Sequence, residues 1–205
     1  DYDTAVNKDH VLVPFHNIEV STKILRDGMK YDELPEEDKE RYEEDFTEDG
    51  EIPEEIPPEK INKCIFNQDT VDHVLNDLMT NGLRDASGNR VGKTIIFAQN
   101  KAHAQYIVER FDKLYPKLGK EGFCQRVVCT DSYVQDLIKL FKSPDKEPHI
   151  VVSVDMLDTG VDVPEIVNLV FFKIVRSKIK FWQMIGRGTR LRPGLLGEGR
   201  DKTQF

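Results

Sequence analysis

Short apolar stretches alternate with amphipathic stretches in the second half of the sequence, and this alternation limits the possible fold more than any other feature. Apolar stretches of strand length lie at 93–98, near 123–129, at 149–155 and at 166–172. Helical periodicity marks the stretches 101–114, 132–142 and 178–187. Apolar strands that alternate with helices form parallel sheets buried on both faces. The sequence therefore predicts an α/β fold with a mostly parallel sheet covered by helices on both faces.

The first 60 residues have a different character. Residues 1–30 are expected to form short extended segments, because apolar and polar residues alternate around Val13 and Ile18. Pro35 is expected to begin an acidic helix that ends near Phe46, and the proline-containing stretch from Glu51 to Lys60 is expected to be a linker. We therefore divide the chain into an extended and acidic helical appendage, 1–60, and an α/β domain, 61–205. Within that domain, Asp69 is expected to cap a helix that buries Val71, Val74, Leu75 and Leu78 and stops at Asn81-Gly82.

Charge is distributed unevenly along the chain. The net charge is −8, yet residues 31–60 alone hold 15 acidic residues against Lys39, Arg41 and Lys60. Residues 173–202 hold nine basic residues against Glu198 and Asp201, so a polyanion is expected at the C-terminal edge. Two interpretations of the acidic stretch stay open: a solvated surface, or a segment that competes with DNA or meets a partner subunit.

Cysteine spacing and hydropathy exclude several classes of protein. Cys64, Cys124 and Cys129 form no C-x-x-C pair, which favours reduced and mostly buried thiols over a zinc site or a disulfide. The histidines are scattered, and His103 is expected to be a packing or capping residue. No apolar run approaches the roughly 20 residues that span a bilayer. A cytoplasmic protein without a bound metal of its own and without a membrane partner is expected.

The segment Gln183-Met184-Ile185-Gly186-Arg187-Gly188-Thr189-Arg190 is the strongest functional signal. Spacing of three residues would place Arg187 and Arg190 on neighbouring turns of one helix face, where two guanidinium groups can hold a phosphate. A basic helix end with solvated arginines is the alternative, since Lys and Arg commonly collect near helix C-termini.

Two further motifs precede this segment in the chain. The apolar strand of VSVDMLDTGVDVP, residues 152–164, breaks into a loop at Gly160 and is stopped by Pro164. Upstream, KTIIFAQN at 93–100 is predicted to be a buried parallel strand that opens into the helix carrying His103. Ligands of such sheets bind at the carboxyl ends of the strands, where these loops are expected.

In order and spacing, the three motifs resemble motifs IV, V and VI of superfamily 2 helicases and translocases, whose motor lobes are RecA-like. Two stretches are similar in sequence to the motor (R) subunit of type I restriction endonucleases, or to a close relative among bacterial restriction and defence translocases. They are VSVDMLDTGVDVP and NLVFFKIVRSKIKFWQMIGRGTRL. The resemblance covers nearly the whole chain and implies the second RecA-like lobe, the helicase C-terminal domain.

The resemblance also implies roles for individual residues. Arg187 and Arg190 would stabilise the charge that develops on the γ-phosphate of ATP, and Gln183 would order that phosphate or the attacking water. Asp162 would accept hydrogen bonds from the ribose, or else cap the turn before Pro164, and Gly160 and Gly186 would line the nucleotide. The DNA backbone would be contacted by polar residues at strand ends, namely Asn100, Thr130, Ser153 and Thr159.

The turn Gly88-Asn89-Arg90-Val91-Gly92-Lys93-Thr94 is not expected to be a P-loop. Its spacing is one residue short, and it leads into a strand instead of opening a helix. No Asp-Glu metal box follows an apolar strand either, so ATP and Mg²⁺ are expected to be held mainly by a first RecA-like lobe outside this sequence.

The resemblance thus implies one lobe of an ATP-dependent translocase of double-stranded DNA, in a type I restriction-modification enzyme that is a hydrolase only as a whole. The expected partners are double-stranded DNA, the first lobe and nuclease domain of the same parent chain, and the modification and specificity subunits. Two alternatives stay open: the C-terminal lobe of another superfamily 2 DNA or RNA helicase, and a non-catalytic module that binds nucleic acid or a partner.

Overall fold

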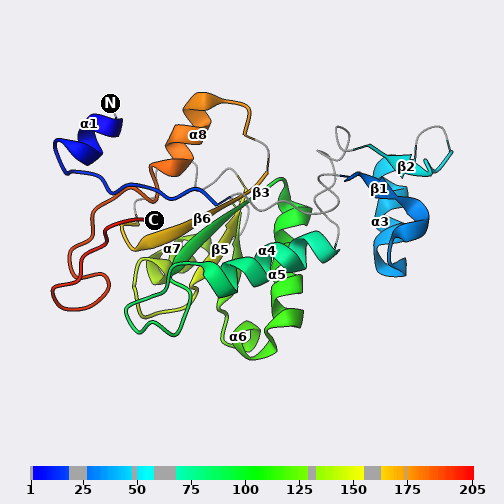
Figure 1. Cartoon of the computed structure of the whole chain (residues 1–205). Coiled ribbons are helices and arrows are strands. Elements are labelled where there is room, and N and C mark those ends of the chain that lie inside the picture. The colour runs from blue at the N-terminus through cyan, green and yellow to red at the C-terminus, as the bar shows by residue number, and fades with distance from the viewer. Residues whose placement is uncertain are drawn as a thin grey trace. The chain divides into compact units, whose positions relative to one another are not determined.

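The computed structural model describes residues 2–18, 27–47, 50–57, 68–128, 133–154, 163–173 and 175–205. These residues belong to two compact units (Figure 1). The sheet unit contains residues 1–17 and 77–205, and the acidic unit contains residues 18–76. A domain boundary at residue 60 stays a prediction, because residues 58–67 lie outside the described part of the chain.

A four-stranded parallel sheet forms the centre of the sheet unit, in the order β4-β5-β3-β6. Its strands are β3 (Lys93–Ala98), β4 (Cys124–Val127), β5 (Ile150–Ser153) and β6 (Ile166–Phe172). Thr94 of β3 lies opposite Ile150 of β5 and Asn168 of β6. All six residues of β3 are buried, which agrees with its central position. The predicted parallel sheet is confirmed.

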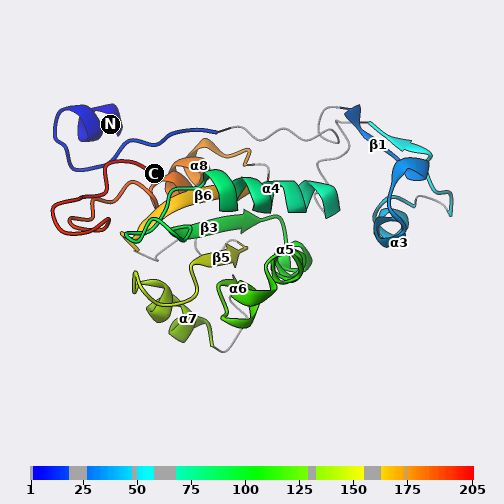
Figure 2. The ribbon, with the colours of Figure 1, turned by 60° about the horizontal axis from the view of Figure 1, so that its bottom comes forward.

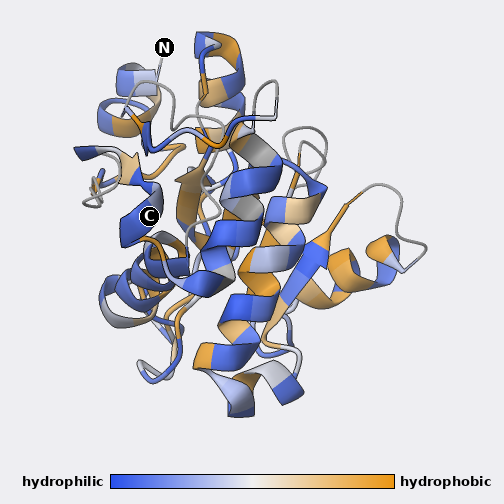
Figure 3. Cartoon of the chain, turned by 90° about the vertical axis from the view of Figure 1, so that its right-hand side faces the viewer, coloured by the Kyte–Doolittle hydropathy of each residue, from blue (hydrophilic) through white to orange (hydrophobic). Residues whose placement is uncertain are grey.

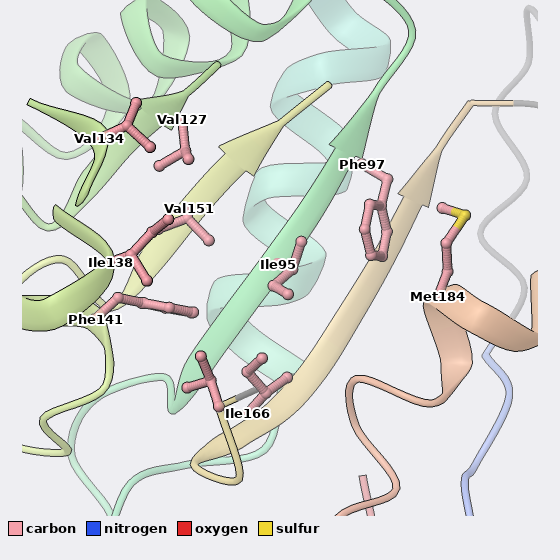
Figure 4. Close-up of a cluster of buried hydrophobic side chains, with 10 residues drawn as sticks. Ile95, Phe97, Val127, Val134, Ile138, Phe141, Val151, Ile166 and Met184 are labelled. Carbon is pink, nitrogen blue, oxygen red and sulfur yellow. The ribbon is translucent and has the colours of Figure 1, made fainter. Parts of the chain in front are cut away.

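Helices cover both faces of this sheet, as predicted (Figure 2). They are α5 (Lys101–Leu114), α6 (Pro116–Lys120), α7 (Val134–Phe141) and α8 (Lys178–Ile185). Residues of α7 and α8 share one core with Ile95 and Phe97, and Figure 4 shows Met184 of α8 beside Phe97. Phe171 of β6 packs on this core, whereas the ring of the next residue, Phe172, contacts His103 of α5 with centroids 4.8 Å apart. Since neighbouring strand residues point to opposite faces, α5 covers the other side.

Hydropathy follows the same layers. The strands are mainly hydrophobic, while the helices carry hydrophobic residues on one side and hydrophilic residues on the other (Figure 3). In α5, the buried residues are His103, Ala104, Ile107, Arg110 and Phe111. Their spacing of three and four residues forms one helix face, which explains why the helix was predictable from its periodicity.

The N-terminal residues of the sheet unit include a helix, α1 (Tyr2–Asn7). The expectation of extended segments throughout 1–30 is therefore wrong for this stretch. The ring of Tyr2 lies 5.7 Å from that of Phe15 and 5.4 Å from that of Trp182 in α8. These contacts come from residues distant in sequence, so local alternation could not reveal them. The extended conformation expected around Val13 is present, since Leu12 forms an antiparallel bridge with Arg190.

The acidic unit has a small core of its own. Strands β1 (Met29–Lys30) and β2 (Glu55–Ile56) pair antiparallel, with the 3₁₀ turn η1 (Tyr31–Glu33) and helix α3 (Glu36–Phe46) between them. Met29, Tyr42, Phe46 and Ile56 are buried together. The expected helix from Pro35 is confirmed. The stretch from Glu51 to Lys60 is not simply a linker, because Tyr42 donates to Pro53 O at 2.7 Å and Ile56 packs on Tyr42 and Phe46.

Helix α4 (Gln68–Asn81) ends where expected, before Gly82. Its first described residue is Gln68, so Asp69 lies within the first turn and is not the cap. Among the four predicted core positions, Val71, Leu75 and Leu78 are buried and Val74 is half-buried. A Cβ atom at Gly82 would lie 2.5 Å from Leu78 O, which explains a glycine at this helix end.

The described residues contain no helix long and apolar enough to cross a membrane. Of the three cysteines, Cys124 lies in the described part of the chain and is a buried free thiol, as expected. Burial raises the pKa of Cys124 well above its usual value.

Lys93, the first residue of β3, is 3% exposed. Its Nζ donates to Pro148 O at 2.8 Å and to Lys146 O, and it lies 5.3 Å from the centre of the Phe141 ring. Burial lowers the pKa of Lys93 from 10.5 to about 8, although the nearby Glu147 carboxylate opposes this shift.

We predict that the wild-type chain gains stability relative to Lys93→Met as the pH rises from about 8 toward 10.5. In this range the unfolded chain still binds the Lys93 proton while the folded chain has released it, so the free energy of unfolding increases with pH. Urea unfolding at several pH values measures the difference. The exposed Lys113→Met serves as a control, and pH profiles of wild type and Lys93→Met that run parallel would contradict the prediction.

Candidate functional site

The arginine motif begins in α8 and continues beyond it. Ser177 caps this helix, since its Oγ accepts the Lys180 N–H at 3.3 Å. The helix ends at Ile185, and Gly186–Gly188 form a turn in which the Gly188 N–H donates to Ile185 O at 2.9 Å. Arg187 lies in this turn, and Arg190 lies in the extended bridge to Leu12.

The expected helix 178–187 is confirmed for 178–185, but the expectation that both arginines lie on one helix face is wrong, because both follow the end of the helix. Phe205 approaches the turn closely: a Cβ atom at Gly188 would lie 2.0 Å from its Cδ2, which explains a glycine at this position. Thr189 is 3% exposed, and its Oγ1 donates to Gly186 O at 3.3 Å. We call residues 186–190 the arginine turn. The turn brings both guanidinium groups onto one short, irregular segment of the sheet unit.

The arginine turn lies beside β6 and not beyond its carboxyl end. Phe181, near the start of α8, contacts Phe171 near the end of β6, with ring centres 5.5 Å apart. Ile185, at the other end of α8, shares a core with Leu169, further back along the strand. The helix thus runs back along β6, which lies at the edge of the described sheet. Gln183 on this helix is exposed, as a role toward an external ligand requires.

The chain around the arginine turn is strongly basic. From Lys173 to Pro193 there are seven lysines and arginines and no acidic residue. One of them, Arg192, is paired with Glu165 at 3.0 Å. Guanidinium groups match phosphoryl oxygens and remain charged at all relevant pH values. The described residues offer no group of three or more His, Cys, Asp or Glu side chains that could hold a metal ion.

Two of the other predicted positions, Asn100 and Ser153, lie at the carboxyl edge of the sheet. Ser153 at the end of β5 is opposite Phe97 of β3 and Val127 of β4, so the loops after these three strands leave the same edge. Asn100 follows β3 at this edge and is exposed. Ser153 is fully buried, which does not fit the predicted contact with a DNA phosphate. Thr130, Thr159, Gly160 and Asp162 lie outside the described residues.

Asn100 also has a structural task that the sequence analysis did not assign. Its side-chain oxygen accepts the His103 N–H at 2.8 Å and so caps α5. His103 is fully buried, its Nδ1 accepts the Gln99 N–H at 3.2 Å, and burial lowers its pKa to about 4. His103 is therefore neutral and is a packing residue, as predicted.

The segment 88–94 is not a P-loop, as predicted. Its first residues belong to a turn, 85–90, that is enclosed by an antiparallel bridge between Arg84 and Val91 and has a φ of 73° at Gly88. It leads into the amino end of β3, the edge opposite to Asn100. Its position excludes the arrangement of a P-loop, which joins the carboxyl end of a strand to a helix.

The fold and these motifs define a C-terminal helicase domain. The family model of the helicase conserved C-terminal domain matches residues 70–192, and the chain belongs to this family. The endonuclease subunit of the type I restriction enzyme EcoKI from Escherichia coli K12 is 38% identical over 150 residues, which are 68% of this chain and 12% of that protein. The endonuclease subunit of the type I restriction enzyme EcoAI from Escherichia coli is 27% identical over 143 residues, 65% of this chain and 18% of that protein.

A solved structure agrees with these relatives. A fragment assigned as the HsdR subunit of a type I restriction enzyme from Vibrio vulnificus YJ016 superimposes with a TM-score of 0.53 and 29% identity, over 61% of this chain and 24% of that one. The expected resemblance to the R subunit of type I restriction endonucleases and the expected RecA-like α/β lobe are confirmed. The chain spans less than a fifth of the length of the two endonuclease subunits.

Asn100→Ala should lower the free energy of unfolding by about 1 kcal/mol, because it removes the oxygen that caps α5. Asn100→Asp keeps that oxygen and should retain the stability, while its negative charge should weaken binding of DNA by the full-length parent. Urea unfolding and a DNA-binding titration measure the two effects. An Asn100→Asp variant with unchanged DNA affinity would remove Asn100 from the DNA contacts, and an Asn100→Ala variant of full stability would contradict the cap.

Proposed function

We propose that this chain is the second motor lobe of an ATP-dependent translocase of double-stranded DNA in a type I restriction-modification enzyme. The observation that carries the proposal is the arginine turn with the basic stretch around it, within a C-terminal helicase domain. The similarity to endonuclease subunits of two type I restriction enzymes supports this choice over other helicases.

In this proposal, ATP and Mg²⁺ are held mainly by a first lobe of the parent chain. Arg187 and Arg190 donate to the γ-phosphate, where negative charge develops during its transfer to water. Gln183, exposed on α8, orients that phosphate or the attacking water. Gly186, the first residue of the arginine turn, has no side chain and so lets the nucleotide approach the backbone closely. Gly160 and Asp162 contact the sugar side of the nucleotide.

The proposed DNA track runs along the carboxyl edge of the sheet. Asn100, Thr130 and Thr159 contact the sugar-phosphate backbone, which positions the lobe without reading sequence. Ser153 is omitted from the track because it is buried. Closure of the cleft between the two lobes on ATP, and its opening after hydrolysis, would move the duplex by one step per cycle.

The wider assembly is part of the same proposal. The expected partners are the first lobe and the nuclease domain of the parent chain, together with the modification and specificity subunits. A measurement of ATP turnover distinguishes the proposal from the alternative of a non-catalytic binding module. Such a module has no need of Arg187 or Arg190.

In the full-length parent, Arg187→Ala or Arg190→Ala should lower DNA-stimulated ATP turnover by about 10³-fold or more, as the loss of arginine fingers does in related phosphoryl transfers. Nucleotide binding should weaken much less, because the arginines act mainly on the transition state. Steady-state ATPase kinetics and a nucleotide-binding titration measure the two effects. Arg176→Ala, an exposed arginine in the same basic stretch, is the matched control and should turn over normally.

Translocation at nearly wild-type speed by either variant of the arginine turn would contradict the assignment. An equal loss with Arg176→Ala would also contradict it, because general positive charge and not the arginine turn would then be responsible.

A further inference from the structure

The arginine turn is held by a chain segment from the other end of the sequence. The Val13 N–H donates to Thr189 O at 2.9 Å, and Leu12 and Arg190 form an antiparallel bridge. Figures 1 and 2 both show the N-terminal segment running beside the C-terminal end of the chain. The backbone of the turn thus has a hydrogen-bonded partner beyond the end of α8.

Phe205, in a third segment of the chain, contacts both the N-terminal segment and the arginine turn. The His16 N–H donates to Phe205 O at 2.9 Å, and the Phe205 N–H donates to Pro14 O at 3.2 Å. Its ring occupies the space that a side chain at Gly188 would need. Phe205 is 7% exposed and shares a core with Val13 and Ile185.

The tail that carries Phe205 is itself anchored to the sheet. Lys202 is 2% exposed, and its Nζ donates to Pro164 O at 3.2 Å and to Ile166 O at the start of β6. The same ammonium group lies 5.6 Å from the centre of the Phe205 ring. The position of Phe205 is therefore tied to the strand along which α8 packs.

We propose that residues 12–16 and Phe205, here called the clamp, are positioning elements that set the direction of Arg187 and Arg190 toward the nucleotide. The inference rests on the proposed function of the arginine turn. Two glycines in the turn give its backbone wide conformational freedom, which the clamp removes before ATP binds. The clamp contacts the backbone and the core of the turn, so it affects the reaction only by positioning the two arginines.

Positioning makes a specific kinetic difference. A misplacement of about 1 Å in a catalytic group can cost about 10²-fold in rate. Such a loss falls on kcat when the group acts in the transition state, whereas the KM for ATP depends chiefly on contacts made by the first lobe. A merely structural role of Phe205 would lower thermal stability and leave kcat unchanged at temperatures where the protein is folded.

The test compares two phenylalanines in the full-length parent. Phe205→Leu removes the ring from Gly188, and Phe141→Leu removes a buried ring from α7, on a core that does not include the arginine turn. Both are assayed for DNA-stimulated ATP turnover at a temperature at which circular dichroism shows them folded. We expect Phe205→Leu to lower kcat about 10-fold or more with a KM within about 3-fold of wild type, while Phe141→Leu retains kcat.

Phe205→Tyr keeps the ring beside Gly188 and should recover most of the lost kcat. Arg190→Ala in the same assay distinguishes a failure of the proposed function from a failure of the clamp inference. If Arg190→Ala turns over normally, the proposed function fails and the clamp with it. If Arg190→Ala loses turnover but Phe205→Leu keeps full kcat, or if Phe141→Leu loses as much as Phe205→Leu, the clamp inference alone is overturned.

Discussion

Burial of β3 on both faces is the constraint on which the rest of the sheet unit depends. All six of its residues are buried, and β5 and β6 hydrogen-bond to it on either side. A strand without a solvent face needs helices above and below the sheet, and α5 and α7 supply them. Each helix returns the chain to the amino edge of the sheet before the next strand begins, so β3, β4 and β5 all end at the opposite, carboxyl edge, where ligands of α/β sheets bind.

The position of the arginine turn follows from the edge strand of the same sheet. Strand β6 ends the described sheet, and α8 runs back along it through Phe181 and Ile185. The turn after α8 therefore emerges beside an edge strand of the described sheet. Antiparallel contacts from Leu12 and Val13 and the ring of Phe205 support it there. The residues that support the turn, Leu12, Val13 and Phe205, are different from the arginines that are proposed to contact the nucleotide.

Local signals predicted the elements whose ends are fixed locally. Strands Lys93–Ala98 and Ile166–Phe172 and helix Lys101–Leu114 have the bounds expected from the sequence, because apolar runs and the Asn100 cap determine them. Helix α8 begins at Lys178 as expected but ends at Ile185, two residues before the predicted end. The contact of Phe205 with Gly188 comes from a segment that local periodicity could not reveal.

Tertiary contacts also decided what the sequence could not reveal about single side chains. Tyr2 lies in a helix and contacts Trp182, and Lys93 and Lys202 are buried where carbonyl oxygens from distant segments accept their hydrogen bonds. Asn100 was singled out as a ligand and is also a cap, and Ser153 was singled out and is buried. A polar residue at a strand end thus identifies the correct edge of the sheet, but its burial and its partners depend on neighbours that a sequence motif does not specify.

The proposed role of the arginine turn depends most on the direction of Arg187 and Arg190 in the complete motor. A structure of the full-length parent with DNA, ADP and a fluoride mimic of the transferred phosphate measures this directly. We predict guanidinium nitrogens of Arg187 and Arg190 within hydrogen-bonding distance of the mimic, about 2.7–3.2 Å, with Val13 still bonded to Thr189. Both arginines directed into solvent or onto the DNA, with the mimic held by other residues, would contradict the account.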